Sequence, residues 1–346
     1  MPNEQPITAD GADGTAPARA GGRRRLSTVR LDFFLDPTQR LTEQERALMT
    51  AMLRSLIGDI VGEIRGALPA GWSAANDDDS AIVETLTRAR LLDDAGLMAL
   101  LFRRADEERI GAAMRARSGR REARVIQGLV SHEDGAVSAA AMALILARGR
   151  RRDRFGQSLV GFDDLRPRCA ERLVYAIAAA LRNALAVAHG ETAADGALGK
   201  AATAVVEDRT EGRSIEALSN GLIVLLDNVG DLSDELLLAC AQEGEIAFLG
   251  QVLARRAQIS ADVSIDELLS GSAERVMTLL RVAGSSREFG AGLLGSVGDL
   301  LGIEDPGSAI EFFESIGVDE VHSAKGWLAT PRAYRAAVEA LGASHG

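Results

Sequence analysis

Residues 232–303 read LSDELLLACAQEGEIAFLGQVLARRAQISADVSIDELLSGSAERVMTLLRVAGSSREFGAGLLGSVGDLLGI and repeat one short plan several times. Runs of apolar residues with helical spacing follow Ser233, Ser264 and Ser285, and the last two have a glutamate three residues later, as Ser264…Glu267 and Ser285…Glu288. This is the capping-box pattern, in which the serine oxygen and the carboxylate accept hydrogen bonds from backbone N–H groups at a helix start. The stretch therefore predicts a stack of short helices.

Apolar residues with helical spacing continue on both sides of this stretch. In the clearest run, Thr42…Glu45 forms another capping box and apolar pairs recur every fourth residue as far as Leu68. Asp305–Pro306 is a typical helix start, with an acid at the cap and proline in the first turn. The predicted helices cover residues 42–68, 80–92, 93–103, 106–117, 120–131, 134–148, 163–188 (or 168–188), 199–207, 214–228, 233–242, 245–257, 264–269, 273–283, 286–301, 306–316 and 332–341.

The arrangement of these helices predicts an all-α fold. No segment of the sequence sustains the alternation of apolar and polar residues that a half-buried strand shows. Helix pairs of about 30 to 45 residues favour a HEAT-like helical repeat array, α-solenoid-like but irregular. We expect a disordered N-terminal tail over residues 1–28, which lack periodicity, and helical arrays over 29–190 and 191–346 that are continuous with each other.

Composition limits the class of protein. The 346 residues are 47% apolar and 26% charged, as in a globular protein, and only 4% are aromatic. The two cysteines, Cys169 and Cys240, lie within apolar helical patterns, which predicts buried free thiols in a reducing compartment. There is no apolar N-terminal leader and no window long enough for a membrane span, so we expect a soluble, cytoplasmic protein.

Three patterns that resemble functional motifs have simpler interpretations. Gly290–Gly295 matches the dinucleotide-binding glycine pattern, but it lacks the preceding strand and is interpreted as close helix packing. Asp77–Asp79 lacks the ligand spacing of a calcium loop and is interpreted as a helix start. None of the four histidines has the spacing of a zinc site. We therefore expect no metal, no cofactor and no catalytic residue.

Three segments of the sequence carry a resemblance to a known family: Leu41–Met49 running into Leu53–Asp59, Leu173–Leu185, and Leu236–Gly284. Together they are similar to a helical family of alphaproteobacteria that is described only as domain of unknown function 2336. The similarity covers most of the chain after Arg40, and the order of the segments strengthens it. It implies a HEAT-like all-α fold in a bacterial protein and supplies no catalytic residue.

Positive charge is concentrated in one part of an acidic chain. The net charge is −11, but residues 103–172 carry +6 and the remainder carries −17. The sharpest local feature is an arginine run that we take as the candidate binding site, formed by Arg148, Arg150, Arg151, Arg152 and Arg154. Such a run can be a solvated helix end or contact the acidic C-terminal half, which we favour. It can also bind an acidic protein partner or, less favoured, nucleic acid.

The function expected from these observations is protein–protein interaction. Stacked helix pairs form an extended surface that suits a scaffold or regulatory adaptor with a protein partner and no catalytic activity of its own. The alternative is an arginine-mediated binder of nucleic acid or another acidic ligand. A third hypothesis, an enzyme of unrecognised type, requires a pocket in which polar groups converge.

Overall fold

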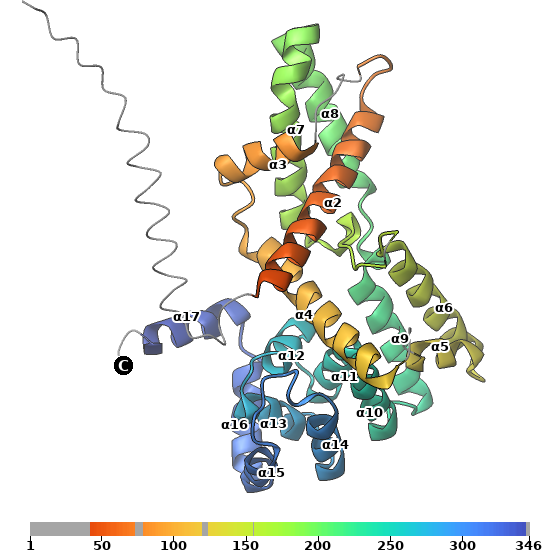
Figure 1. Cartoon of the computed structure of the whole chain (residues 1–346), viewed down its shortest axis with the longest axis vertical. Coiled ribbons are helices and arrows are strands. Elements are labelled where there is room, and N and C mark those ends of the chain that lie inside the picture. Colours follow the sequence, from red (N-terminus) through yellow and green to blue (C-terminus); the bar gives the residue numbers. More distant parts are fainter. Residues whose placement is uncertain (1–41, 73–78, 120–123, 155, 344–346) are drawn as a thin grey trace, which may run out of the picture. The chain divides into compact units, whose positions relative to one another are not determined.

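The computed structural model describes residues 42–72, 79–119, 124–154 and 156–343. These residues are almost entirely helical, and the described ranges contain one isolated β-bridge, between Arg152 and Ser158, and no strand. The predicted all-α class is therefore confirmed (Figure 1). The tail predicted over residues 1–28 lies outside the described residues.

The helices follow one another with short connections. The α-helices are α2 Glu43–Ala67, α3 Asp79–Arg88, α4 Ala95–Ser118, α5 Val125–Gly128, α6 Gly135–Arg150, α7 Pro167–His189, α8 Glu191–Asp208, α9 Ile215–Val229, α10 Asp234–Glu243, α11 Ile246–Ala257, α12 Ala261–Leu268, α13 Ala273–Val282, α14 Arg287–Val297, α15 Pro306–Ser315, α16 Val318–Leu328 and α17 Arg332–Ala343. Single 3₁₀ turns are η2 Leu129–Ser131, η3 Phe162–Asp164 and η4 Glu211–Arg213.

Helix α4 differs most from the prediction. Two helices were expected, over 93–103 and 106–117, with Asp106 opening the second, but the structure has one continuous helix. Asp106 is buried inside α4 and accepts a hydrogen bond at 2.9 Å from Arg109, one turn further along. The acid that does cap the helix is Asp94, which accepts from the backbone N–H groups of Gly96 and Leu97.

Two of the three serine caps expected in residues 232–303 were misplaced. Ser233 caps α10 as predicted, because its hydroxyl accepts from the backbone N–H of Leu236. Helix α12 begins four residues before Ser264, at the cap Ser260, and α14 is capped by Ser286 instead of Ser285. Ser264 lies inside α12 and is fully buried, and Ser285 directly precedes the serine that caps α14.

Helix α16 was not predicted, although its start carries a signal. The carboxylate of Glu320 accepts a hydrogen bond at 2.8 Å from the backbone N–H of Gly317, which completes half of a capping box. The helix start was missed because a capping box is recognised by a serine or threonine at the cap position, and this position is a glycine. Helix α8 is also longer than expected and begins at Glu191, directly after the turn at Gly190.

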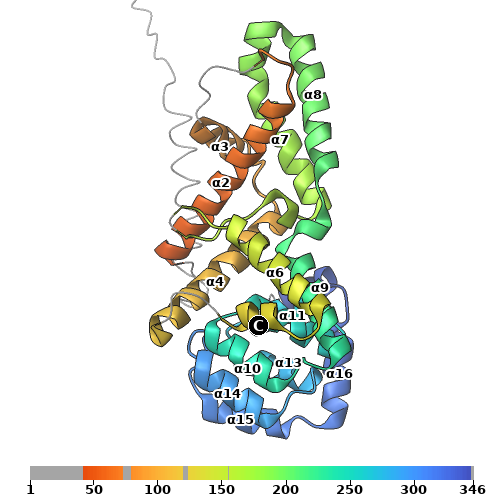
Figure 2. The same ribbon diagram turned by 90° about the vertical axis from the view of Figure 1, so that its right-hand side faces the viewer.

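The helices before α10 and those that follow it differ in which other helices they pack against. Helices α7 and α8, joined at Gly190, lie side by side, while α2 packs against both α4 and α8, and α6 packs against α9 (Figure 2). From α10 onward, most helices pack against the next one or two in sequence. One apolar cluster extends from Ile110 of α4 to Leu328 of α16. The division predicted at residue 190 stays a prediction.

The glycines of α14 bear out one part of the close-packing interpretation. A Cβ atom added to Gly292 would lie 2.8 Å from a methyl carbon of Leu238, so α10 and α14 approach closely at this point. At Gly295 an added Cβ would meet nothing within 4 Å. The pattern therefore has a packing role at Gly292, where a side chain would separate the two helices.

The position of the α12 cap can be tested with two serines. We expect Ser260→Ala to lower the free energy of unfolding by about 1 kcal/mol, because the hydroxyl that accepts from the Val263 N–H is lost. Ser264→Ala should leave stability unchanged or raise it, since the buried Ser264 hydroxyl has no hydrogen-bond partner. Urea unfolding followed by circular dichroism measures both. The opposite order of the two variants would place the helix start at Ser264.

Candidate functional site

The arginine run is divided between the interior and the surface. Helix α6 ends at Arg150, so the run continues from the last helical turn into the following loop. Arg148 forms an ion pair at 2.8 Å with Glu245, and Arg151 forms one at 3.0 Å with Asp164. Arg148 thus makes the predicted contact with the acidic C-terminal half. The other three side chains, Arg150, Arg152 and Arg154, are exposed.

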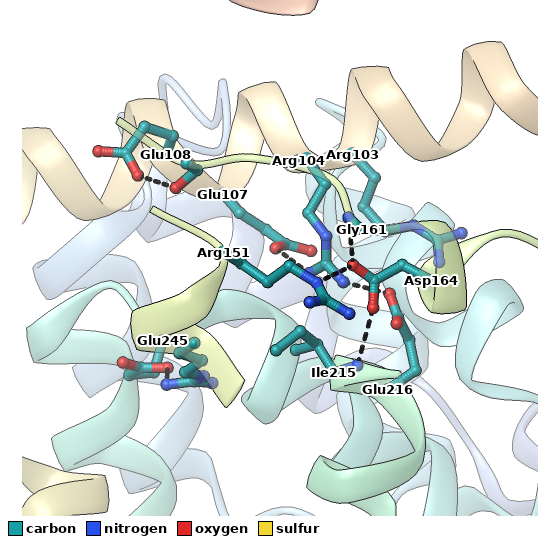
Figure 3. Close-up of polar contacts among 12 residues, drawn as sticks. Arg103, Arg104, Glu107, Glu108, Arg151, Gly161, Asp164, Ile215, Glu216 and Glu245 are labelled. Carbon is teal, nitrogen blue, oxygen red and sulfur yellow. Dashed lines mark hydrogen bonds and ion pairs between the residues drawn. The ribbon is translucent and has the colours of Figure 1, made fainter. Parts of the chain in front are cut away.

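The buried carboxylate of Asp164 anchors the arginine run through Arg151. Its side chain has no exposure to solvent and accepts three hydrogen bonds, at 3.0 Å from Nε of Arg151, 2.9 Å from the Gly161 N–H and 3.0 Å from the Ile215 N–H (Figure 3). A Cβ atom on Gly161 would lie 2.1 Å from the Arg151 guanidinium, so only glycine leaves room for this arrangement. The loop after α6 is thereby tied to the first turn of α9.

A second buried group of charges lies beside Asp164. Arg104 of α4 contacts Glu107 at 2.6 Å and Glu216 of α9 at 2.5 Å, and its side chain is almost inaccessible to water (Figure 3). Burial by itself lowers the pKa of an arginine, but the two carboxylates outweigh it and raise the pKa of Arg104 above its ordinary value. Arg104 therefore stays charged and joins α4 to α9.

Two adjoining cavities open beside this buried group. The larger, of about 650 Å³, lies among η4, α9 and α11, and the smaller, of about 290 Å³, lies among α4, η3 and α7. Glu211, Ser214 and Glu216 line both, and Cys169 lines the smaller one. The side-chain oxygen of Gln251, which lines the larger cavity, is buried without a hydrogen-bond partner. These cavities are where the hypothesis of an enzyme can be tested.

Helix α6 is apolar on two opposite faces. Its inner face packs through the buried side chains of Val137, Ala141 and Leu144. Its outer face exposes Met142 and Leu146, which are 42% and 56% accessible. A surface helix of a globular protein normally carries polar residues on the side that faces water. The outer face of α6 therefore has the composition of a surface that another molecule covers.

The exposed residues of α6 form one continuous stripe. Ala139, Met142, Ala143 and Leu146 follow the spacing of three and four that places residues on one side of a helix, and Arg150 is the next in the series. We call this set, together with Arg152 and Arg154, the α6 stripe. It is apolar along most of its length and basic at the C-terminal end of the helix.

The loop that carries the basic end is held by its own hydrogen bonds. Arg152 donates to the Gly156 carbonyl at 2.7 Å and forms a β-bridge with Ser158. The Leu159 N–H donates to the Arg151 carbonyl at 2.7 Å. Because Arg151 is anchored on Asp164, the backbone beside Arg150 and Arg152 is fixed before any partner binds.

Met142 and Leu146 were not among the predicted site residues. The sequence of α6, GAVSAAAMALILARGR, contains a signal that could have found them, because it has no polar side beyond Ser138 and its terminal arginines. A helix that is apolar all round is usually fully buried. Only the structure shows that one side of this helix is left open.

Comparison with known proteins gives no relative from which a function could be transferred. No family model, no curated protein and no solved structure matches the chain. The similarity to domain of unknown function 2336 therefore stays a prediction. Within the described ranges, no group of three or more His, Cys, Asp or Glu side chains is placed to hold a metal ion, and no helix is long and apolar enough to cross a membrane.

Variants of two neighbouring arginines test which side chains of the run are anchored in the interior. We expect Arg151→Ala to lower the free energy of unfolding by about 3 kcal/mol, because it leaves the buried Asp164 carboxylate without its counter-ion. Arg150→Ala, one residue away and exposed, should change it by less than about 0.5 kcal/mol. Denaturant unfolding measures both. Equal stabilities for the two variants would mean that Arg151 is not anchored in the interior.

The two thiols should be unreactive in the folded protein. Both are buried, as predicted, and burial, reinforced by the nearby Asp94 carboxylate, raises the pKa of Cys169 to about 11. Burial also raises the pKa of Cys240. Because the thiolate is the reacting form, alkylation by iodoacetamide at about pH 8 should be slow and should quicken at Cys169 only as the pH approaches about 11. Peptide mass spectrometry locates the label, and the unfolded protein is the control. Rapid labelling of folded Cys169 at about pH 8 would contradict the burial.

Proposed function

We propose that the protein is a scaffold or regulatory adaptor that binds a protein partner through the α6 stripe and has no catalytic activity of its own. The observation that carries this proposal is the exposure of Met142 and Leu146 on a helix whose opposite face is already buried. Covering such residues removes apolar surface from water, at roughly 25 cal/mol for each Å² buried. The interaction thus has a physical driving force that needs no change in the protein itself.

The helical architecture supports the same proposal. From α10 to α16, several helices pack against their neighbours in sequence, as in HEAT-like repeat arrays, although α10 also packs against α14. Membership of the alphaproteobacterial family and a cytoplasmic location remain parts of the proposal. Arrays of this kind bind partners along extended surfaces, and the α6 stripe is a surface of that sort.

Binding of nucleic acid is the alternative that the arginine run suggested. Three observations favour a protein partner over it. Arg148 and Arg151 are paired with carboxylates, only three of the five arginines are exposed, and the net charge of the chain is −11. Nucleic-acid surfaces are usually basic over a whole domain. Met142 and Leu146, which precede Arg150 on the same side of α6, suit an apolar contact better than a phosphate backbone.

If the protein is an enzyme of unrecognised type, its substrate would bind at the two cavities beside Glu216. Their lining brings together carboxylates, arginines and a thiol, but the arginine nearest Glu216 is engaged in holding α4 and α9 together. The α6 stripe lies on a different set of elements. A binding function at the stripe and a ligand in the cavities can therefore be tested separately.

Capture of the partner with matched variants tests the proposed function. The tagged full chain should recover a stoichiometric partner from native lysate. Leu146→Asp should lose this partner, because a carboxylate then lies in the middle of the apolar stripe. Val187→Asp is the control, since Val187 is also apolar and is 90% exposed, but it lies on α7.

Two results would count against the proposal. One is the recovery of no stoichiometric partner by the wild-type protein in any growth phase. The other is recovery of the same partners by the wild-type chain and the Leu146→Asp variant, with both proteins folded by circular dichroism.

A further inference from the structure

The length and composition of the α6 stripe indicate what kind of protein surface can cover it. Its apolar part runs from Ala139 to Leu146, and Arg150 extends it by one more turn, a length of about 16 Å at 1.5 Å per residue. This length suits a helix of about three turns laid along α6. The apolar residues are a continuous row, so the covering surface needs its own apolar row at spacings of three and four.

Charge sets the direction of the covering helix. The exposed arginines lie only at the C-terminal end of α6, where Arg150 ends the helix and Arg152 and Arg154 follow it. At the opposite end, the exposed residue Glu133 precedes the cap Asp134. A partner that places carboxylates over the arginine end gains favourable pairs, whereas one that places them over Glu133 meets like charge.

The hydrogen bonds of Arg151 hold the backbone that carries Arg150 and Arg152. Arg148 and Arg151 are paired in the interior, and the hydrogen bonds of Arg152 hold the turn. Less conformational entropy is therefore lost when a partner binds than would be lost by a mobile arginine tail. Guanidinium groups also bind carboxylates through two parallel hydrogen bonds, which favours carboxylates over single neutral acceptors.

We propose that the α6 stripe binds an acidic amphipathic helix of a partner protein, with the carboxylates of that helix over Arg150, Arg152 and Arg154. This inference rests on the proposed function, since it assumes that the stripe is a protein-binding surface, and it adds the chemistry and direction of the partner. An anionic membrane surface and a second copy of this chain are the competing occupants. Two large apolar side chains and three arginines form a smaller patch than membrane anchoring normally uses.

Designed peptides test the chemistry without knowledge of the natural partner. One fluorescent helical peptide of about 18 residues carries a leucine face and glutamates clustered at one end, and a second has glutamine at each of those glutamates. Fluorescence anisotropy with the full-length protein measures both affinities at low and at high salt. We expect the glutamate peptide to bind about tenfold more tightly than the glutamine peptide at low salt, and the difference to shrink as salt is added.

Matched charge-reversal variants locate the site. Arg150→Glu combined with Arg154→Glu should weaken the glutamate peptide by about tenfold or more, and a lysine version of the peptide should regain affinity for this variant. The control, which changes the net charge equally at exposed arginines elsewhere, is Arg168→Glu combined with Arg213→Glu. Leu146→Asp should abolish binding of both peptides. Urea unfolding of each variant ensures that a loss reflects the surface and not the fold.

The outcomes separate this inference from the proposed function. If Leu146→Asp loses the lysate partner but the glutamate and glutamine peptides bind equally, or neither binds, the acidic helix is wrong while the interaction surface stands. Binding to vesicles with anionic lipid, lost in the arginine variant and without peptide binding, would assign the stripe to a membrane. A wild-type dimer that Leu146→Asp converts to a monomer, seen by sedimentation, would assign it to a second copy of the chain.

Discussion

The guanidinium of Arg104, almost closed off from water between Glu107 and Glu216, is the interaction on which the described arrangement depends. A buried guanidinium is costly unless it is paired, so the pair with Glu216 fixes where Arg104 of α4 lies relative to the first turn of α9. Replacing such a group by apolar residues can leave stability unchanged, whereas removing one member does not. We interpret the group as a device that selects one packing among several similar helix contacts.

Other arginines of helix α4 also contact segments that are distant in sequence. Arg103 contacts Asp262 of α12 at 2.8 Å, and Arg109 donates to the Leu300 carbonyl at 3.2 Å. Burial alone would raise the pKa of Asp262, but Arg103 outweighs it and lowers that pKa. Arg117, at the end of the helix, pairs with Asp299, but both side chains are largely exposed and this pair contributes little to stability. A helix of mixed composition thus connects segments far apart in sequence through side chains that cannot be exchanged without a loss of pairing.

The sequence predicted a helix start correctly where the start depends only on residues within one helical turn. Asp305 and Ser233 cap their helices as expected, because a side-chain oxygen and a backbone N–H three residues away decide the matter. The assignment of Ser264 and the division of α4 at Asp106 were wrong, since burial by distant helices overrides both patterns. The candidate site was predicted only as a charged run. Which of its arginines face inward depends on Asp164 and Glu245, and no spacing rule links these to the run.

The three hydrogen bonds to Asp164 have a consequence for local opening of the structure. The Ile215 N–H, in the first turn of α9, donates to this side chain, and the same carboxylate holds Arg151 in the loop after α6. Amide hydrogen exchange at that position requires the carboxylate to withdraw, which also releases the loop. We therefore expect the start of α9 and the loop after α6 to open together, although Asp164 and Ile215 are 51 positions apart in the sequence.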